Sequence, residues 1–121
     1  MKLKTDPRHI KRISLMQTLF TWEFLRKEKP PKEITEIIVN LKDIDDAITK
    51  GATNRPLSEI NKIDLAILRL AVFELIINKQ QPVKVIIDEA VELGKEFGSD
   101  SSSAFVNGAL GHIVNLRKIK T

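Results

Sequence analysis

Apolar residues recur along most of the chain at intervals of three and four positions, the spacing of an amphipathic helix. The first pattern runs from Ile10 to Phe24 and must end before Pro30-Pro31, because proline interrupts helical hydrogen bonding. Asp6-Pro7 precedes this pattern and has the residue types of a helix start. Its carboxylate can accept from free amides, and its proline lacks a donor that the first turn does not need. We predict that the first helix begins here.

Two short amphipathic segments follow the prolines. Ile34 to Leu41 predicts one helix, and Ile44 to Ile48 predicts another that stops near Gly51. Asp43 is placed to cap the second of these helices. After a stretch of turn-forming residues, Leu57 to Ile60 predicts a brief helical turn.

The most hydrophobic segment of the chain runs from Ile63 to Ile77 and is apolar on nearly every side. A buried strand is the alternative interpretation, but strands are usually much shorter, so the length favours a central helix surrounded by others. Pro82 then opens another helical pattern, which Gly98 should terminate. The apolar positions predicted to form its scaffold are Val85, Ile86, Leu93 and Phe97.

The final helix should start within Ser101 to Ser103, whose hydroxyls can cap it, and should bury the apolar positions up to Val114. No segment requires a strand, so the predicted fold class is all-α. The chain of 121 residues has the size of one domain. We divide it into an N-terminal helical subdomain, residues 1–51, and a C-terminal one, residues 57–121.

Composition narrows the class of protein. Hydrophobic residues make up 42% of the chain and charged residues 30%, as expected for a folded, helix-rich protein. There is no cysteine, which excludes disulfides and thiolate metal sites. The N-terminus does not resemble a secretory signal, and no apolar stretch is long enough to span a membrane. We therefore expect a cytoplasmic protein.

The net charge of +4 fits a nucleic-acid partner without identifying one. Its placement is more informative, because cations gather at the two ends of the chain. Near the N-terminus they lie where free helix amides also favour phosphate, although charged termini often serve only solubility. The N-terminal group comprises Lys2, Lys4, Arg8, Lys11 and Arg12, and the C-terminal group comprises Arg117, Lys118 and Lys120.

The usual enzyme signatures are absent, and we predict neither catalysis nor a cofactor. Four carboxylates of one helix, Asp88, Glu89, Glu92 and Glu96, could form a metal site, but a solvated acidic face is far commoner. For His9, a nucleic-acid contact and an ordinary exposed position are both open. His112 is interpreted as structural or exposed.

Other polar and aromatic positions have two interpretations each. The serines Ser101 to Ser103 can cap a helix or present hydroxyls to an RNA backbone. Phe105 can belong to the core, or it can stack on a base if it is partly exposed. By periodicity alone, Phe20 is a core aromatic and Asp64 is an acid at a helix start.

Three segments resemble the NusB family of bacterial transcription antitermination factors, in the same order along the chain. They are RISLMQTLFTW at residues 12–22, IDLAILRLAVFEL at residues 63–75, and the run from Pro82 to Leu110, which includes VELGKEFGSDSSSAFVNGAL. The resemblance implies a bundle of roughly six to seven helices in two packed subdomains, the N-terminal one shortened. It also implies a binding scaffold rather than an enzyme.

Proteins of this family bind the boxA element of single-stranded nascent RNA together with NusE, a small-subunit ribosomal protein that doubles as a transcription factor. The resemblance therefore implies both partners, action within an RNA polymerase antitermination complex on ribosomal RNA operons, and no membrane. A homodimer is an open alternative for the chain alone. The family's RNA-contacting positions fall on Lys2, Arg8, His9, Lys11, Arg12, Ser101 and Phe105, and its NusE-contacting positions fall on Phe20 and Asp64.

Two alternatives stay open. A similar domain precedes the catalytic part of some RNA cytosine methyltransferases, and because no catalytic segment follows Thr121, that interpretation requires a truncated chain. The chain could also be a helical protein-interaction module without RNA function, since Ile10 interrupts its basic turn and makes that turn thinner than the family's arginine cluster.

Overall fold

The computed structural model describes residues 6–26 and 28–121, and over these ranges the chain is helical, without a strand. Three single helical turns lie within the same ranges: η1 (Lys32–Ile34), η2 (Leu57–Glu59) and η3 (Glu74–Asn78). The six α-helices are α1 (Pro7–Leu25), α2 (Thr35–Val39), α3 (Leu41–Gly51), α4 (Lys62–Phe73), α5 (Val83–Phe97) and α6 (Ser102–Leu116). The predicted fold class and helix number are confirmed.

Both ends of α1 have a local cause. At its start, Asp6 Oδ1 accepts a hydrogen bond of 2.8 Å from the Arg8 amide, as the sequence predicts. At its end, Arg26 adopts a left-handed conformation with φ of 44°, and its amide donates to the Trp22 carbonyl at 2.8 Å. The helix therefore ends at Leu25, before the prolines are reached.

The predicted cap of α3 is wrong. This helix begins at Leu41 and follows Asn40, so Asp43 lies inside the first turn rather than at the cap. For α4 the cap is Asn61, whose side-chain oxygen accepts from the Ile63 amide at 2.8 Å. The central segment is confirmed as a helix, and it continues into the π-helical turn η3.

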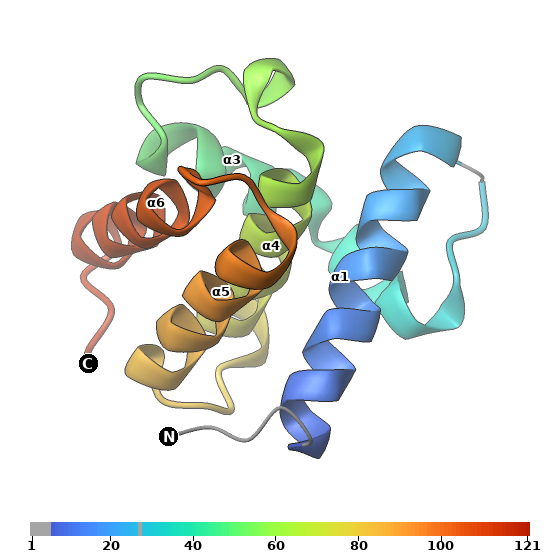
Figure 1. Cartoon of the computed structure of the whole chain (residues 1–121), viewed down its shortest axis with the longest axis horizontal. Coiled ribbons are helices and arrows are strands. Elements are labelled where there is room, and N and C mark those ends of the chain that lie inside the picture. The colour runs from blue at the N-terminus through green and yellow to red at the C-terminus, as the bar shows by residue number, and fades with distance from the viewer. Residues whose placement is uncertain (1–5, 27) are drawn as a thin grey trace.

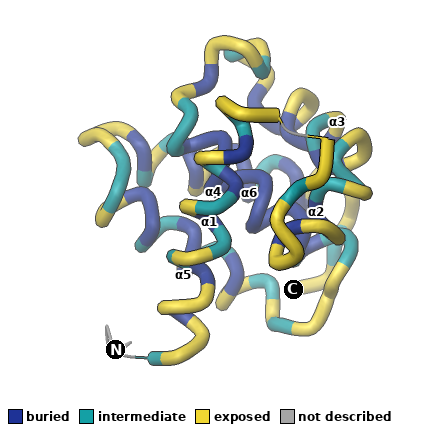
Figure 2. The backbone as a smooth tube through the Cα atoms, turned by 90° about the vertical axis from the view of Figure 1, so that its right-hand side faces the viewer, coloured by how far each residue is buried: buried dark blue, intermediate teal, exposed yellow. Residues whose placement is uncertain are grey.

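Figure 1 shows α1 and α6 on opposite sides of the molecule, with α4 and α5 between them. α1 packs on α4, α5 packs on α4 and α6, and α3 contacts both α4 and α6. In Figure 2 the buried positions line the surfaces on which the helices meet. One cluster of buried apolar side chains includes Met16, Ile44, Ile67 and Leu110, so both halves of the chain share a core. The subdomain boundary stays a prediction.

Three apolar positions of the predicted helical patterns are exposed. Ile10 and Phe24 are 51% and 60% exposed on α1, and Val85, predicted to belong to the scaffold of α5, is 39% exposed. All three side chains follow the helical period but lie outside the buried stripe. Where α5 meets α6, by contrast, the backbones approach closely, because a Cβ on Gly94 would lie 3.2 Å from Ser103 Cα.

A buried ionic cluster joins three helices. The Arg69 side chain of α4 is 2% exposed and donates to Glu23 of α1 at 2.6 Å. It also forms two hydrogen bonds with the Asp45 carboxylate of α3, at 2.9 and 3.0 Å. Burial lowers the pKa of Arg69, but the hydrogen bonds and charges of the two carboxylates outweigh burial and raise it. The cation is therefore paired on both sides.

Candidate nucleic-acid interface

The first turns of α1 expose two cations to solvent. The Arg8 side chain is 71% exposed and holds Asp6 in a weak ion pair of 3.4 Å. Lys11 is also exposed, and both residues border a hollow of about 290 Å³ between α1 and the η1–α2 region. Glu33 and Glu36 line the same hollow. The two cations are therefore accessible to solvent, and two carboxylates share the hollow that they border.

His9 does not lie on this outer face. Its side chain is 2% exposed, and its two ring nitrogens lie 3.0 Å from Glu89 Oε1 and 2.7 Å from Glu96 Oε1. Both nitrogens are therefore engaged by carboxylates of α5. The expectation of an exposed His9 is wrong, and a direct contact with RNA finds no support in this geometry.

Arg12 is also turned inward. Its side chain is 9% exposed, and Nε and Nη2 form a bidentate pair with Glu74 at 2.9 and 2.8 Å. Nη1 lies 3.4 Å from Glu89 Oε1. The hydrogen bond to Glu74 outweighs burial and raises the pKa of Arg12. Arg12 therefore fastens α1 to η3 and α5, which corrects its assignment to the exposed RNA-contacting turn.

The four carboxylates of α5 are not simply a solvated face. Glu89 is buried against His9 and Arg12, and Glu96 contacts His9. On the outer side, Asp88 pairs with Lys84 at 3.2 Å and Glu92 pairs with Lys95 at 3.7 Å. The described residues contain no group of three acidic or histidine side chains that could hold a metal ion. Two of the four carboxylates, Glu89 and Glu96, thus hold α1 against α5.

The elbow between α5 and α6 is built by serines with different roles. Ser102 is fully buried, and its hydroxyl accepts from the Ser99 amide at 2.9 Å. Ser101 is exposed, and its hydroxyl lies 3.3 Å from that of Ser99. Ser101 is the residue before α6, but its side chain forms no capping hydrogen bond, so the prediction of a hydroxyl cap is wrong for Ser101. Ser101 is instead exposed to solvent.

Phe105 follows the elbow and is half-buried. The Arg55 guanidinium lies over its ring at 4.2 Å from the centroid, a cation–π contact. Sequence reasoning missed Arg55, because it lies in the turn between α3 and η2 and belongs to no basic cluster. The fold brings this cation to the elbow, where it adds positive charge beside an aromatic ring.

The exposed turn of α1 and the elbow are connected through α5. Glu96 lies five positions before Ser101 and contacts His9, the neighbour of Arg8. The contact between His9 and Glu96 therefore fixes the start of α1 relative to the end of α5. Lys2, the remaining residue of the predicted basic turn, lies outside the described residues.

A second candidate surface lies toward the C-terminal end of α1. Phe20 is half-buried and packs edge-to-face on Phe24, with ring centroids 4.9 Å apart and planes at 71°. Because Phe24 is 60% exposed, the pair presents an aromatic surface. The sequence analysis placed Phe24 in the apolar pattern of the first helix and so missed its exposure.

Asp64 lies in the first turn of α4 and is only 2% exposed. Its Oδ1 atom is buried without a hydrogen-bond partner in the part of the chain that the structure describes. Lys62, two positions earlier, lies 3.7 Å from Glu23 of α1. The start of α4 thus lies against the half of α1 that carries the aromatic pair.

The remaining expectations concern single residues and membranes. His112 Nδ1 lies 3.0 Å from the Gly51 carbonyl oxygen, which confirms a structural role between α6 and α3. Among the residues with described positions, no helix is long and apolar enough to cross a membrane.

Fold and site together define a class: an all-helical domain with exposed cations at the start of its first helix and an arginine–aromatic pair at a serine elbow. The NusB family model matches residues 31–115, most of the chain. The chain belongs to the NusB family. The matched range begins after α1, so the basic turn lies outside it.

Individual relatives agree. The Transcription antitermination protein NusB of Roseiflexus castenholzii is 51% identical over 74 residues, which cover 60% of this chain and 52% of that protein. The protein of the same name from Lachnoclostridium phytofermentans is 36% identical over 82% of this chain and 80% of its own length. The chain spans about half the length of the first curated relatives it matches, 52% and 55% for two of them.

Solved structures extend the likeness to the whole fold. Thermotoga maritima NusB, described as "T. maritima NusB, P3121, Form 2", superposes with a TM-score of 0.81 at 32% identity, covering 95% of this chain and 93% of the other. A chain in "Crystal Structure of a Plectonemic RNA Supercoil" gives a TM-score of 0.80 at 22% identity, which shows the shared fold alone. Since these superpositions cover almost the entire chain, they extend well beyond the range of the family model.

Proposed function

We propose that this chain is an RNA-binding transcription antitermination factor that binds boxA-type single-stranded RNA together with NusE. Family membership and the names of the relatives support the antitermination role. The observation that carries RNA binding is the exposure of Arg8 and Lys11 at a helix N-terminus that the contact between His9 and Glu96 holds against the end of α5. The setting would be the cytoplasmic RNA polymerase complex on ribosomal RNA operons, with no cofactor.

The proposed RNA surface contains fewer contacting residues than the sequence predicts, because two of the predicted residues act on the fold instead. In this proposal Arg8, Lys11 and Lys2 contact the phosphates. Such contacts supply most of the affinity for RNA and its salt dependence. At the elbow, Ser101 offers a hydroxyl, and Phe105 with the stacked Arg55 offers a base-sized flat surface. His9 and Arg12 act as positioning residues, because their polar atoms are already held by carboxylates.

The proposed NusE surface centres on the aromatic pair of α1. Phe20 and Phe24 present a contiguous apolar area of the kind that anchors protein interfaces. Asp64 supports this surface from the start of α4.

RNA binding is tested by titrating boxA-like and scrambled single-stranded RNA at several salt concentrations, with and without purified NusE. The variant Arg8→Ala with Lys11→Ala should weaken binding and flatten the slope of log affinity against log salt by up to about 1.4, since each phosphate contact on single strands contributes about 0.7. The matched control removes two exposed cations elsewhere, Lys32→Ala with Lys42→Ala, and should leave the slope nearly unchanged.

Two results would overturn this assignment. One is equal affinity for boxA-like and scrambled RNA in the presence of NusE. The other is an equal loss of slope in the Lys32 and Lys42 control, because this would show that net charge alone, and no particular surface, determines binding.

NusE binding is tested separately, by calorimetry without RNA. Phe24→Ser removes an exposed ring that packs edge-to-face on its neighbour Phe20, so it should weaken NusE binding while lowering the free energy of unfolding by about 1 kcal/mol. Val39→Ser is the matched control, since Val39 is 77% exposed and belongs to another helix, α2. An equal loss of affinity in both variants would refute the aromatic pair as the anchor.

One observation favours a second candidate, a helical protein-interaction module without RNA function. Two residues of the predicted RNA-contacting turn, His9 and Arg12, are buried and paired. The same two assays separate the candidates, because the second predicts NusE or another protein partner and no RNA binding above that of scrambled sequence.

A further inference from the structure

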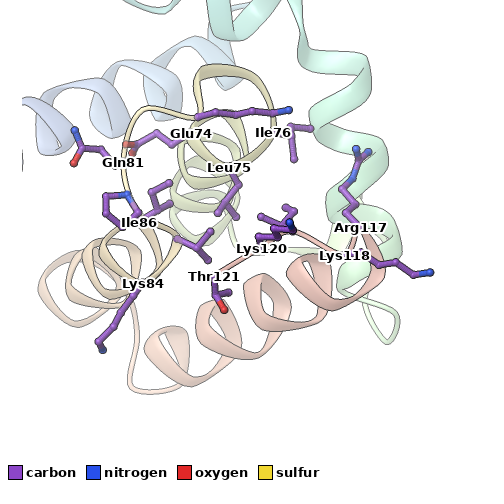
Figure 3. Close-up of a pocket in the computed structure, with 14 residues that line it drawn as sticks. Glu74, Leu75, Ile76, Gln81, Lys84, Ile86, Arg117, Lys118, Lys120 and Thr121 are labelled. Carbon is purple, nitrogen blue, oxygen red and sulfur yellow. The ribbon is translucent and has the colours of Figure 1, made fainter.

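A groove of about 590 Å³ lies between the start of α5 and the C-terminal segment that follows α6 (Figure 3). Leu75 of η3, Val83 and Ile86 of α5, and Ile119 of the C-terminal segment supply apolar side chains to its lining. In Figure 3 the Leu75 and Ile86 side chains point into the space between η3, α5 and the segment. The floor is thus aliphatic.

Two left-handed residues shape this groove. Lys79 has φ of 57° and ends η3, and Lys118 has φ of 52° and reverses the chain after α6. After this reversal the Ile119 amide donates to the Val114 carbonyl at 3.0 Å, and the Ile119 side chain packs on the core. The C-terminal segment therefore forms a fixed wall of the groove.

The rim carries an unbalanced positive charge. Five cations line the groove: Lys79, Lys84, Arg117, Lys118 and Lys120. Among the described residues, only Lys84 of these five forms an ion pair, with Asp88 at 3.2 Å. The one acidic side chain of the lining, Glu74, is already held by Arg12. The positive potential at the rim is therefore left largely uncompensated.

We propose that this groove docks an acidic segment of a protein partner, with apolar side chains on the aliphatic floor and carboxylates at the basic rim. A nucleic acid fits less well, because the lining contains no aromatic ring on which a base could stack. Aliphatic side chains at the floor instead match leucine- or isoleucine-like anchors. The complementary charge at the rim would speed association and set specificity.

The probe is a fluorescent synthetic peptide of leucine and glutamate at helical spacing, followed by anisotropy at moderate salt. Two further peptides separate the components of recognition, one with lysine in place of glutamate and one with serine in place of leucine. Only the leucine–glutamate peptide should bind. Amide shifts in an NMR titration should be largest around Val83 and Ile119.

The test variant is Arg117→Glu with Lys120→Glu, two exposed rim positions, and its matched control is Lys32→Glu with Lys42→Glu, which makes the same change in net charge elsewhere. The rim variant should lose about tenfold or more in affinity, while the control should stay within about twofold of the parent. Thermal unfolding of both variants shows whether each is folded.

Three outcomes would overturn the proposal. They are no binding by the parent protein, equal losses in the two variants, or tighter binding of single-stranded RNA that depends on Arg117 and Lys120. The last outcome would assign the groove to nucleic acid instead.

Discussion

The two faces of α1 carry the same kinds of residue and use them differently. On the outer face, Arg8 is 71% exposed and Lys11 is exposed, and neither is held in a buried ion pair. On the inner face, His9 and Arg12 are 2% and 9% exposed, and they are fixed by carboxylates of α5 and η3. Cations that are neighbours in a sequence can therefore lie on different faces of one helix, some exposed to solvent and others buried in ion pairs.

The difference follows from the helical period. His9 and Arg12 are three positions apart, and Met16 and Leu19 continue the same stripe at intervals of four and three, into the core. Arg8 and Lys11 lie one position earlier and so about 100° away around the axis. This stripe is the signal that could have placed His9 and Arg12 inside from sequence alone.

Among the charged side chains, the buried cation Arg69 of α4 should have the largest effect on the free energy of unfolding when it is replaced. Arg69→Ala removes the cation that pairs with Asp45 and Glu23, and it leaves Glu23 with only Arg26 and Lys62 beside it. Breaking a buried pair of this kind costs about 3–5 kcal/mol, so the variant should be strongly destabilised in urea unfolding. A loss below about 1 kcal/mol would mean that solvent screens this cluster as it does a surface pair.

Much of the fold could be predicted because each helix has a local signal. Asp6-Pro7 starts α1, Pro82 precedes α5, and the length of the apolar run at residues 63–77 favours a helix over a strand. The site was less predictable, because its polar partners come from distant segments. Nothing near Arg12 in the sequence indicates Glu74, and nothing near Phe105 indicates Arg55. Such pairs depend on packing, not on local propensity.

Arg12→Ala should have the next largest effect, about 3 kcal/mol, since it leaves Glu74 and Glu89 without this partner at the junction of α1, η3 and α5. The double variant Arg12→Met with Glu74→Leu should be less destabilised than Arg12→Ala, because it removes one of the two carboxylates and restores apolar volume. Denaturant unfolding of the three proteins measures this. A double variant at least as unstable as the single one would contradict a charge-pairing role.

Acid should weaken the cluster in which Arg69 pairs with Glu23. Burial raises the pKa of Glu23, but the Arg69 hydrogen bond and the charges of Arg69, Arg26 and Lys62 lower it below its ordinary value of 4.5. Since the folded pKa is the lower one, the stabilisation is complete above pH 4.5 and is lost as the pH falls through the folded pKa.

Glu23→Gln should therefore flatten the fall in the free energy of unfolding below pH 4.5, measured by urea titrations at several pH values. Glu92→Gln is the matched control, because the Glu92 side chain is 43% exposed and its pair with Lys95 is 3.7 Å long. A parallel shift of both variants would show that general charge, and not the Arg69 cluster, sets the acid limb.

The smallest effect on stability should come from the outer face itself. Arg8→Ala with Lys11→Ala removes two exposed side chains whose only ion pair within the described ranges is the 3.4 Å contact between Arg8 and Asp6. Each substitution should change the free energy of unfolding by no more than about 0.5 kcal/mol. The Asp6 cap itself depends on the Arg8 backbone amide, which alanine retains. Urea unfolding of this double variant, measured alongside its RNA titration, tests the contrast between the two faces. A loss of unfolding free energy as large as that of Arg12→Ala would mean that the outer cations also support the fold, and the contrast would then be refuted.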